Sequence, residues 1–321
     1  MPKENSTVVT TEFVFVGLTD NPELLSMLFV LLLVIFITTL VDNLGIIALV
    51  GTSPRLHTPM YFFLSGLSFL DIGCSTAVTP KTMVNLLEEK KSISLIGCAM
   101  QIYVFTGLGC AECFLLAAMA YDRYVTICKP LLYPIIMSSR VCIVLVGGSY
   151  VLGVLYSFVH AIFAFRLSFS GSNVLKKKFC DFPTLFSITT CDIYIDVPLI
   201  FYIAGLVETT TILSVLISYS YIVATILRIR SAAGKLKAFS TCTSHLATVT
   251  IYHRAILILH FRPKSNDRSS VQDLGDKMLS VFYTIVTPLL NPLIYSLRNK
   301  DVKDALGIFQ RKLCNKIINQ Q

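Results

Sequence analysis

The chain carries little charge for its size. Asp, Glu, Lys and Arg make up 14% of its 321 residues, whereas hydrophobic residues make up 54%. A soluble domain has roughly 25% charged residues, and a soluble chain of this length could not bury so much apolar surface in one or two cores. The shortage of charge therefore excludes a disordered chain, a coiled coil and a soluble globular protein. It predicts a membrane protein that crosses the bilayer several times.

Other shortages exclude further classes. The ten cysteines are too few and too scattered for a disulfide scaffold, and the histidines lack the spacing of zinc ligands. The net charge of +8 does not indicate a nucleic-acid-binding protein, because the charges stand at the ends of apolar runs rather than in one patch. No nucleophile, base and metal ligands converge in the sequence, so we expect no enzyme. We also predict no cofactor, except for the sodium ion considered below.

Seven apolar stretches are long enough to cross a bilayer. A spanning helix needs ~20 mostly apolar residues, because the hydrocarbon core is ~30 Å thick and each helical residue rises ~1.5 Å. The predicted fold is an all-α bundle with spans at residues 24–50, 58–80, 95–123, 140–164, 197–228, 238–261 and 271–296. We expect an extracellular tail (1–23), the seven-helix bundle (24–296), and a short amphipathic inner-surface helix with a tail (297–321). A partly disordered tail is the alternative for that last region.

Basic residues collect on one side of these spans. The segments 51–57, 122–140, 228–237 and 298–321 carry 14 Lys and Arg against three Asp, whereas the connections on the other side are balanced in charge. The positive-inside rule then predicts a plasma-membrane protein with its N-terminus outside and its C-terminus inside. Asn5 begins an N-x-[ST] glycosylation sequon, which agrees with an extracellular tail.

The third predicted span has a continuous stripe on one face. Its members follow alternating steps of four and three residues, which places them on one side of a helix: Cys98, Ile102, Phe105, Gly109, Glu112, Leu116, Met119 and Arg123. The same spacing places His245, Val249, Tyr252, Ile256 and Leu259 on one face of the sixth span. The stripe in the third span is either a packing seam or the wall of a site, and the seam is a poor explanation for Glu112.

Ionisable side chains within a membrane are costly, so each is a functional candidate. Asp71 and Glu112, with Asn43 and Asn291, are expected to form either a sodium site or a hydrogen-bonded cluster that joins helices. Two neighbouring carboxylates cannot both stay charged without a cation or a proton.

Arg254 lies near the outer end of the sixth span. It is expected either to extend toward the outer surface or to pair with Glu208, rather than to contact a ligand.

Five motifs occur in order along about 240 residues. They are Leu56–Tyr61, Met119–Cys128, Ser218-Tyr219, Lys237–Leu246 and the segment from Pro288 through Pro292 to Asn299. With these motifs the whole chain resembles an odorant (olfactory) receptor of the rhodopsin-like G-protein-coupled class. Each motif alone is weak, but their order makes the resemblance specific.

The resemblance implies a small organic odorant as ligand and a heterotrimeric stimulatory G protein as partner, with a rise in cyclic AMP and no nucleic acid. It implies a disulfide between Cys98 and Cys180. It also assigns a switch at the G-protein face to Asp122, Arg123, Tyr124, Tyr219, Asn291 and Tyr295.

The chain also departs from the family pattern. Cys191 lacks its usual partner, and His253 and Arg254 follow Tyr252 where the family commonly has glycine.

We expect the ligand to enter from outside between the third, fifth, sixth and seventh spans. The candidates are mostly apolar or aromatic, which suits a small hydrophobic molecule oriented by a few polar groups. They are Ile102, Phe105, Thr106, Gly109, Cys110, Ala204, Val207, Glu208, Tyr252, Ala255, Ile256, Leu259 and Val281. The same receptor sensing a metabolite outside the nose is the alternative function. A transporter or channel is a remote one, because it would need paired broken helices and a chain of charges.

Overall fold

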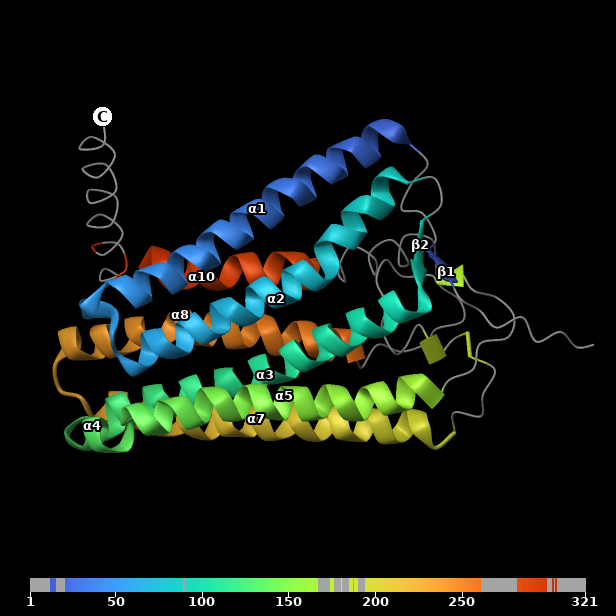
Figure 1. Ribbon diagram of the computed structural model, residues 1–321. Helices are drawn as coiled ribbons and strands as arrows, with labels where there is room; N and C mark the ends of the chain where they lie inside the picture. Colours follow the sequence, from blue (N-terminus) through green and yellow to red (C-terminus); the bar gives the residue numbers. More distant parts are fainter. Residues whose placement is uncertain are drawn as a thin grey trace, which may run out of the picture.

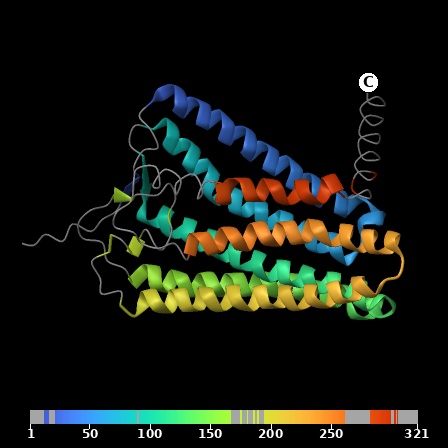
Figure 2. The same cartoon turned by 180° about the vertical axis from the view of Figure 1, so that it is seen from behind.

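The fold is a bundle of long helices that run side by side, with a small sheet at one end (Figures 1 and 2). A computed structural model provides the coordinates. It describes residues 12–15, 21–88, 91–166, 174–175, 180, 185–186, 188–189, 194–260, 282–298, 302 and 304.

The long helices follow the order of the predicted spans. They are α1 (Pro22–Thr52), α2 (Pro59–Leu87), α3 (Leu95–Cys128), α5 (Ser139–Arg166), α7 (Asp196–Arg228) and α8 (Ala232–His260), followed by the π-helix η3 (Phe282–Val286) and α10 (Thr287–Arg298). The short helices η1 (Pro54–Leu56), η2 (Pro130–Leu132) and α4 (Tyr133–Ile136) lie in the connections. Within the described residues, α1, α2, α3, α5 and α7 are both long and apolar enough to cross a membrane.

Local sequence signals explain where several helices begin. The side chain of Asn21 accepts a hydrogen bond from the Glu23 backbone N–H (3.0 Å), and Ser94 caps α3 through the N–H of Gly97 (3.1 Å). Pro22 and Pro59 stand at the first positions of α1 and α2, where a missing N–H costs nothing.

Several helices are longer than the predicted spans. The second span was predicted to end at residue 80, but α2 continues through Pro80 to Leu87. The third continues to Cys128 and the sixth begins at Ala232, so Lys235 belongs to a helix rather than to a loop. A helix keeps its backbone hydrogen bonds beyond the hydrocarbon core, so apolar length alone underestimates its ends. Residues 271–281 of the seventh predicted span and most of 297–321 lie outside the described residues.

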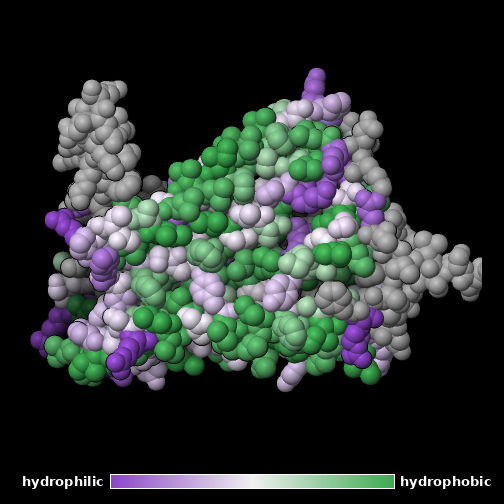
Figure 3. Space-filling model, in the orientation of Figure 1, coloured by the Kyte–Doolittle hydropathy of each residue, from purple (hydrophilic) through white to green (hydrophobic). Residues whose placement is uncertain are grey.

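Helix α3 lies at the centre of the bundle and packs on α2, α5, α7 and α8. The predicted stripe is buried or half-buried along its whole length, so the predicted inward face of α3 is confirmed. The outward faces are apolar instead, as Met27, Val41 and Val144 illustrate with 68%, 63% and 69% exposure. Hydrophobic residues cover most of the face in Figure 3, and hydrophilic ones gather toward its two ends. This surface suits contact with lipid.

The small sheet was not predicted. Strand β1 (Glu12–Phe15) lies between β2 (Ser92–Ser94) and β3 (Val174–Leu175), antiparallel to the first and parallel to the second. Phe13 and Phe15 of β1 are buried in one apolar cluster with Cys98, in the first turn of α3, and with Cys180, between α5 and α7. Part of the predicted tail is therefore packed onto the end of the bundle where α3 begins.

Helices α3 and α5 approach each other closely at two glycines. A Cβ added at Gly153 would overlap the backbone carbonyl of Gly107 and lie 2.9 Å from the Cβ of Ala111. We expect Gly153→Ala to destabilise the protein by about 1–3 kcal/mol, because backbone cannot move aside as a flexible side chain can. Thermal unfolding of the detergent-purified protein would measure this.

Gly147→Ala is the matched control, since it lies on the same helix with no atom within 4 Å of an added Cβ. It should unfold at or slightly above the wild-type temperature, because alanine favours a helix over glycine. Equal melting of the two variants would contradict the close approach.

Candidate functional site

Four buried side chains from three helices meet within the bundle. Cys113 comes from α3, Glu208 from α7, and Tyr252 and His253 from α8; we call them the Glu208 cluster. His253 Nδ1 lies 2.8 Å from Glu208 Oε1, and the two side chains are 7% and 9% exposed. A buried pair of this kind is stable only because each group gives the other a partner that water cannot provide.

Tyr252 and Cys113 extend this cluster toward α3. The Tyr252 hydroxyl donates to the backbone carbonyl of Gly109 (Oη to O, 2.5 Å), and the Cys113 Sγ lies 3.5 Å from that hydroxyl oxygen. The same sulfur lies 3.7 Å from Glu208 Oε2, at the distance of a weak thiol hydrogen bond. The cluster therefore ties α3, α7 and α8 together.

Arg254 was expected either to extend toward the outer surface or to pair with Glu208. Its side chain is exposed, which agrees with the first alternative, and His253 is the partner of Glu208. Successive residues on a helix are rotated by about 100° around its axis, so His253 and Arg254 point in different directions, and His253 is the one that faces the interior.

A second polar cluster joins α2, α3 and α10. The Asn291 amide nitrogen Nδ2 donates to Asp71 at 3.0 and 3.2 Å from its two oxygens, and lies 3.3 Å from Glu112 Oε1. Asn43 was expected here, but its amide donates to the carbonyls of Thr39 and Pro288 instead. We call Asp71, Glu112 and Asn291 the Asp71 cluster. Within the described residues no group of three His, Cys, Asp or Glu side chains has the arrangement of a metal site.

The C-terminal end of α3, predicted to face the cell interior, holds a charged pair. The Arg123 guanidinium donates to the Asp122 carboxylate, and the Tyr133 hydroxyl on α4 donates to the other carboxylate oxygen (Oη to Oδ1, 2.8 Å). Burial, reinforced by the Asp122 charge, raises the pKa of Tyr133 above its ordinary value. The phenol therefore keeps its proton at neutral pH and remains a hydrogen-bond donor.

A histidine links α3, α7 and α8 near this pair. His245 Nε2 lies 3.1 Å from the Leu116 carbonyl, so that nitrogen must donate. For a neutral ring, Nδ1 then accepts from the Tyr219 hydroxyl, 2.7 Å away. Tyr219 and Tyr295, two of the predicted switch residues, are both buried, and Tyr124 is half-buried against Tyr221.

The predicted ligand residues fall into three groups. Four are buried: Ile102, Cys110, Glu208 and Tyr252. Six are half-buried: Phe105, Gly109, Ala204, Val207, Ala255 and Ile256. Thr106 is also half-buried, but its hydroxyl lies 3.5 Å from that of Ser157 and so faces α5. Only the backbone of Leu259 is described, and Val281 lies outside the described residues. The predicted glycosylation site, Asn5, also lies outside them.

The N-terminal end of α3, predicted to face the outside, is fixed by a disulfide. Cys98 and Cys180 are bonded, as the family resemblance implies, and both are buried. Gln101, one turn further along α3, accepts from the Cys180 backbone N–H and donates to the Ala77 carbonyl, each at 3.0 Å. Cys191 lies outside the described residues. Cys180 is therefore joined to α3 by the disulfide and, through the Gln101 side chain, to α2.

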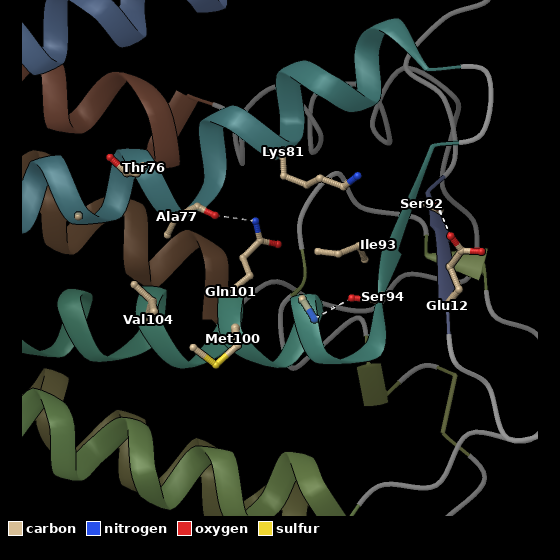
Figure 4. Close-up of a pocket in the computed structure, with 12 residues that line it drawn as sticks. Glu12, Thr76, Ala77, Lys81, Ser92, Ile93, Ser94, Met100, Gln101 and Val104 are labelled. Carbon is tan, nitrogen blue, oxygen red and sulfur yellow. Dashed lines mark hydrogen bonds between the residues drawn. The ribbon is translucent and has the colours of Figure 1, made fainter.

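A cavity of about 660 Å³ lies between the C-terminal half of α2 and the N-terminal part of α3. Lys81, Gln101, Ile93 and Met100 lie around it in Figure 4. It is separate from the predicted ligand residues. Sequence analysis missed Gln101, Cys113 and Tyr133, although a glutamine one turn after an outer cysteine is an unusual polar residue in an apolar span.

Most of the chain is similar in sequence to known proteins. A family model described as "Olfactory receptor" matches residues 32–316. Human olfactory receptor 5T3 is 52% identical over 305 residues, which cover 95% of this chain and 88% of that protein. The chain belongs to the olfactory receptor family.

Two further relatives have the same extent. Mouse olfactory receptor 5AR1 is 48% identical over 95% of this chain and 97% of its own length, and human olfactory receptor 5G3 is 48% identical over 98% and 97%. This receptor is therefore a membrane-embedded, seven-helix protein of the G-protein-coupled class, and it is not an enzyme. The predicted family, fold class and non-enzymatic nature are confirmed.

The Tyr252 hydroxyl supplies a testable contribution to the stability of this receptor. We expect Tyr252→Phe to lower the free energy of unfolding by about 1–2 kcal/mol, because the Gly109 carbonyl and Cys113 lose a buried partner. Thermal unfolding in detergent measures the loss. Tyr202→Phe, on an exposed tyrosine, is the control and should unfold like the wild type; a Tyr252→Phe protein as stable as this control would contradict the assignment.

Proposed function

We propose that this receptor binds a small, mostly apolar organic odorant in the outer half of the bundle and activates a stimulatory, olfactory G protein that raises cyclic AMP. The observation that carries the proposal is that α8 bonds α3 at two heights. Tyr252 of the Glu208 cluster donates to the Gly109 carbonyl, and His245, two helical turns nearer the inner end, bonds the Leu116 carbonyl. A ligand at the first position can therefore bias the second through the same two helices.

The ligand contacts proposed are the buried and half-buried members of the predicted set, apart from Thr106, which faces α5. They come from α3, α7 and α8, the three helices that hold the Glu208 cluster, and most of them are apolar. Such a wall suits an apolar molecule, and the polar cluster suits its single oriented group. The disulfide and the sheet lie at the outer end of the bundle, where they restrict the direction from which an odorant can reach these contacts.

The proposed switch is the inner end of α8 moving away from Arg123. In the arrangement described here Arg123 is held by Asp122, and His245 holds α8 to the Leu116 carbonyl. The odorant must bind more tightly when these contacts are broken, because equal affinity for the two states would shift nothing. The basic start of α8 and the preceding inner connection then help to admit the G protein.

The orientation proposed places the receptor in the plasma membrane with its N-terminus, glycosylated at Asn5, outside. The positive-inside rule supports it, because the described basic residues Arg55, Lys129, Arg228 and Lys235 lie at the end of the bundle that holds Arg123. The disulfide at the opposite end suits an oxidising compartment.

A sodium ion is proposed between Asp71 and Glu112. The two carboxylates share one amide donor, Asn291, which leaves most of their lone pairs without a partner among the groups described around them. A cation or a shared proton would remove the repulsion between them.

Cyclic AMP in cells that display the receptor tests the main proposal. A panel of small odorants that includes acids and amines should contain an agonist, and Arg123→Ala should abolish the response at equal surface amount. Arg166→Ala is the control, because Arg166 is the last residue of α5 and lies at the other end of the bundle from Arg123. This variant should respond like the wild type. An agonist response that persists in Arg123→Ala would contradict the switch.

Replacing sodium in the medium tests the cation. Sodium should change the half-maximal agonist concentration by about fivefold or more in the wild type, as a typical coupling between two sites does. Asp71→Asn should remove this dependence, because it removes one of the two charges that hold the ion. A dependence that survives in Asp71→Asn would place the sodium effect elsewhere.

A further inference from the structure

We propose that the odorant of this receptor is a neutral carbonyl compound, such as a ketone, aldehyde or ester, whose oxygen accepts a hydrogen bond from His253 Nε2. This inference rests on the proposed function, and it adds the chemical class of the ligand and the residue that selects it. His253 was not among the predicted ligand residues.

The starting observation is an unused nitrogen in the Glu208 cluster. His253 is 6% exposed, and its Nδ1 is bound to Glu208, but its Nε2 is buried with no hydrogen-bond partner in the part of the chain that the structure describes. A buried polar atom without a partner is unusual, because it loses its hydration and gains nothing in return.

Charge balance determines what this nitrogen can do. The interior of a membrane protein disfavours a net charge, so the Glu208–His253 pair is favoured with a net charge of zero. If Glu208 is ionised, the imidazole is protonated and both of its nitrogens carry hydrogen. If Glu208 is protonated, it donates to Nδ1 and the single ring hydrogen lies on Nε2. Both neutral arrangements therefore make Nε2 a donor that needs an acceptor.

This requirement separates classes of odorant. A carbonyl oxygen accepts the hydrogen bond without adding charge. An alkane leaves the donor unpaired, and a carboxylate would bring a second negative charge toward Glu208. A protonated amine offers further donors to a ring nitrogen that already donates.

The rest of the odorant is proposed to lie against α7, one turn before Glu208. Gly205 is one turn before Glu208 on α7, and a Cβ added there would meet no atom within 4 Å. Ala204 and Val207 beside it are half-buried and apolar. These small and apolar residues suit contact with the short hydrocarbon chain of an odorant whose oxygen accepts from His253.

Four matched straight-chain series test the class of ligand: methyl ketones, alkanes, primary amines and carboxylic acids of equal lengths. Cyclic AMP is recorded in cells with confirmed surface receptor. The ketones should act at concentrations at least about tenfold lower than the other series, in line with one hydrogen bond to a buried donor. Stronger action of alkanes, amines or acids would overturn the inference and leave odorant sensing intact.

A pair of variants tests the residue. Glu208→Gln first removes the buried charge, so that His253 can be replaced without leaving a carboxylate unpaired. On that background His253→Gln keeps an N–H donor and should retain the preference for ketones, whereas His253→Leu should weaken the ketone response by about tenfold to a hundredfold. Equal ketone responses in the two would overturn the role of Nε2.

Arg254→Gln is the matched control, because Arg254 is the next residue on α8 and its side chain is exposed. It should leave the order of the four series unchanged. For purified receptor, binding of methyl hexyl ketone should lower the carbonyl stretching frequency in the wild type and not in the His253→Leu variant. Silence toward all four series with surface receptor present would overturn this inference, and an agonist found in the wider odorant panel would leave the proposed function intact.

Discussion

Two hydrogen bonds from α8 to backbone carbonyls of α3 connect the outer and inner parts of this receptor. Tyr252 donates to Gly109, and His245 donates to Leu116. Tyr252 and His245 are seven positions apart on α8, and Gly109 and Leu116 are seven positions apart on α3. Seven positions are about two turns, so the antiparallel helices meet twice at matching heights. In hydrocarbon there is no water to replace either bond, so the helices separate only when another partner is supplied.

The polar clusters follow from the same lack of water. Asp71, Glu112 and Asn291 are linked by hydrogen bonds across three helices, and Glu208 and His253 are linked across two. Such contacts specify which helices are neighbours, whereas apolar packing alone would tolerate many arrangements. Among the described residues Nε2 of His253 is one of the buried polar atoms without a partner, and it lies where an odorant is proposed to bind. A receptor site needs this combination of a rigid surround and an unsatisfied group.

The sequence predicted the helical architecture well and the contacts less well. The helices appear in the expected order, and the stripe from Cys98 to Arg123 faces the interior as its spacing requires. Helix ends were less accurate, since α2 passes through Pro80 and α8 begins before Ala238. The sheet that holds β1 against β2 and β3 could not be predicted, because its short strands have no pattern of their own and form only where the outer segments converge.

By itself the sequence determined the family, the order of the spans and the inward face of α3, since composition, motif order and helical spacing are properties of the chain alone. Only the tertiary structure decided the partners. Glu208 pairs with His253 rather than with Arg254, Asn43 bonds Pro288 rather than Asp71, and Tyr133 reaches Asp122 from a separate helix. Periodicity states which side of a helix a residue occupies, but the rotation of each helix against its neighbours decides what that residue meets.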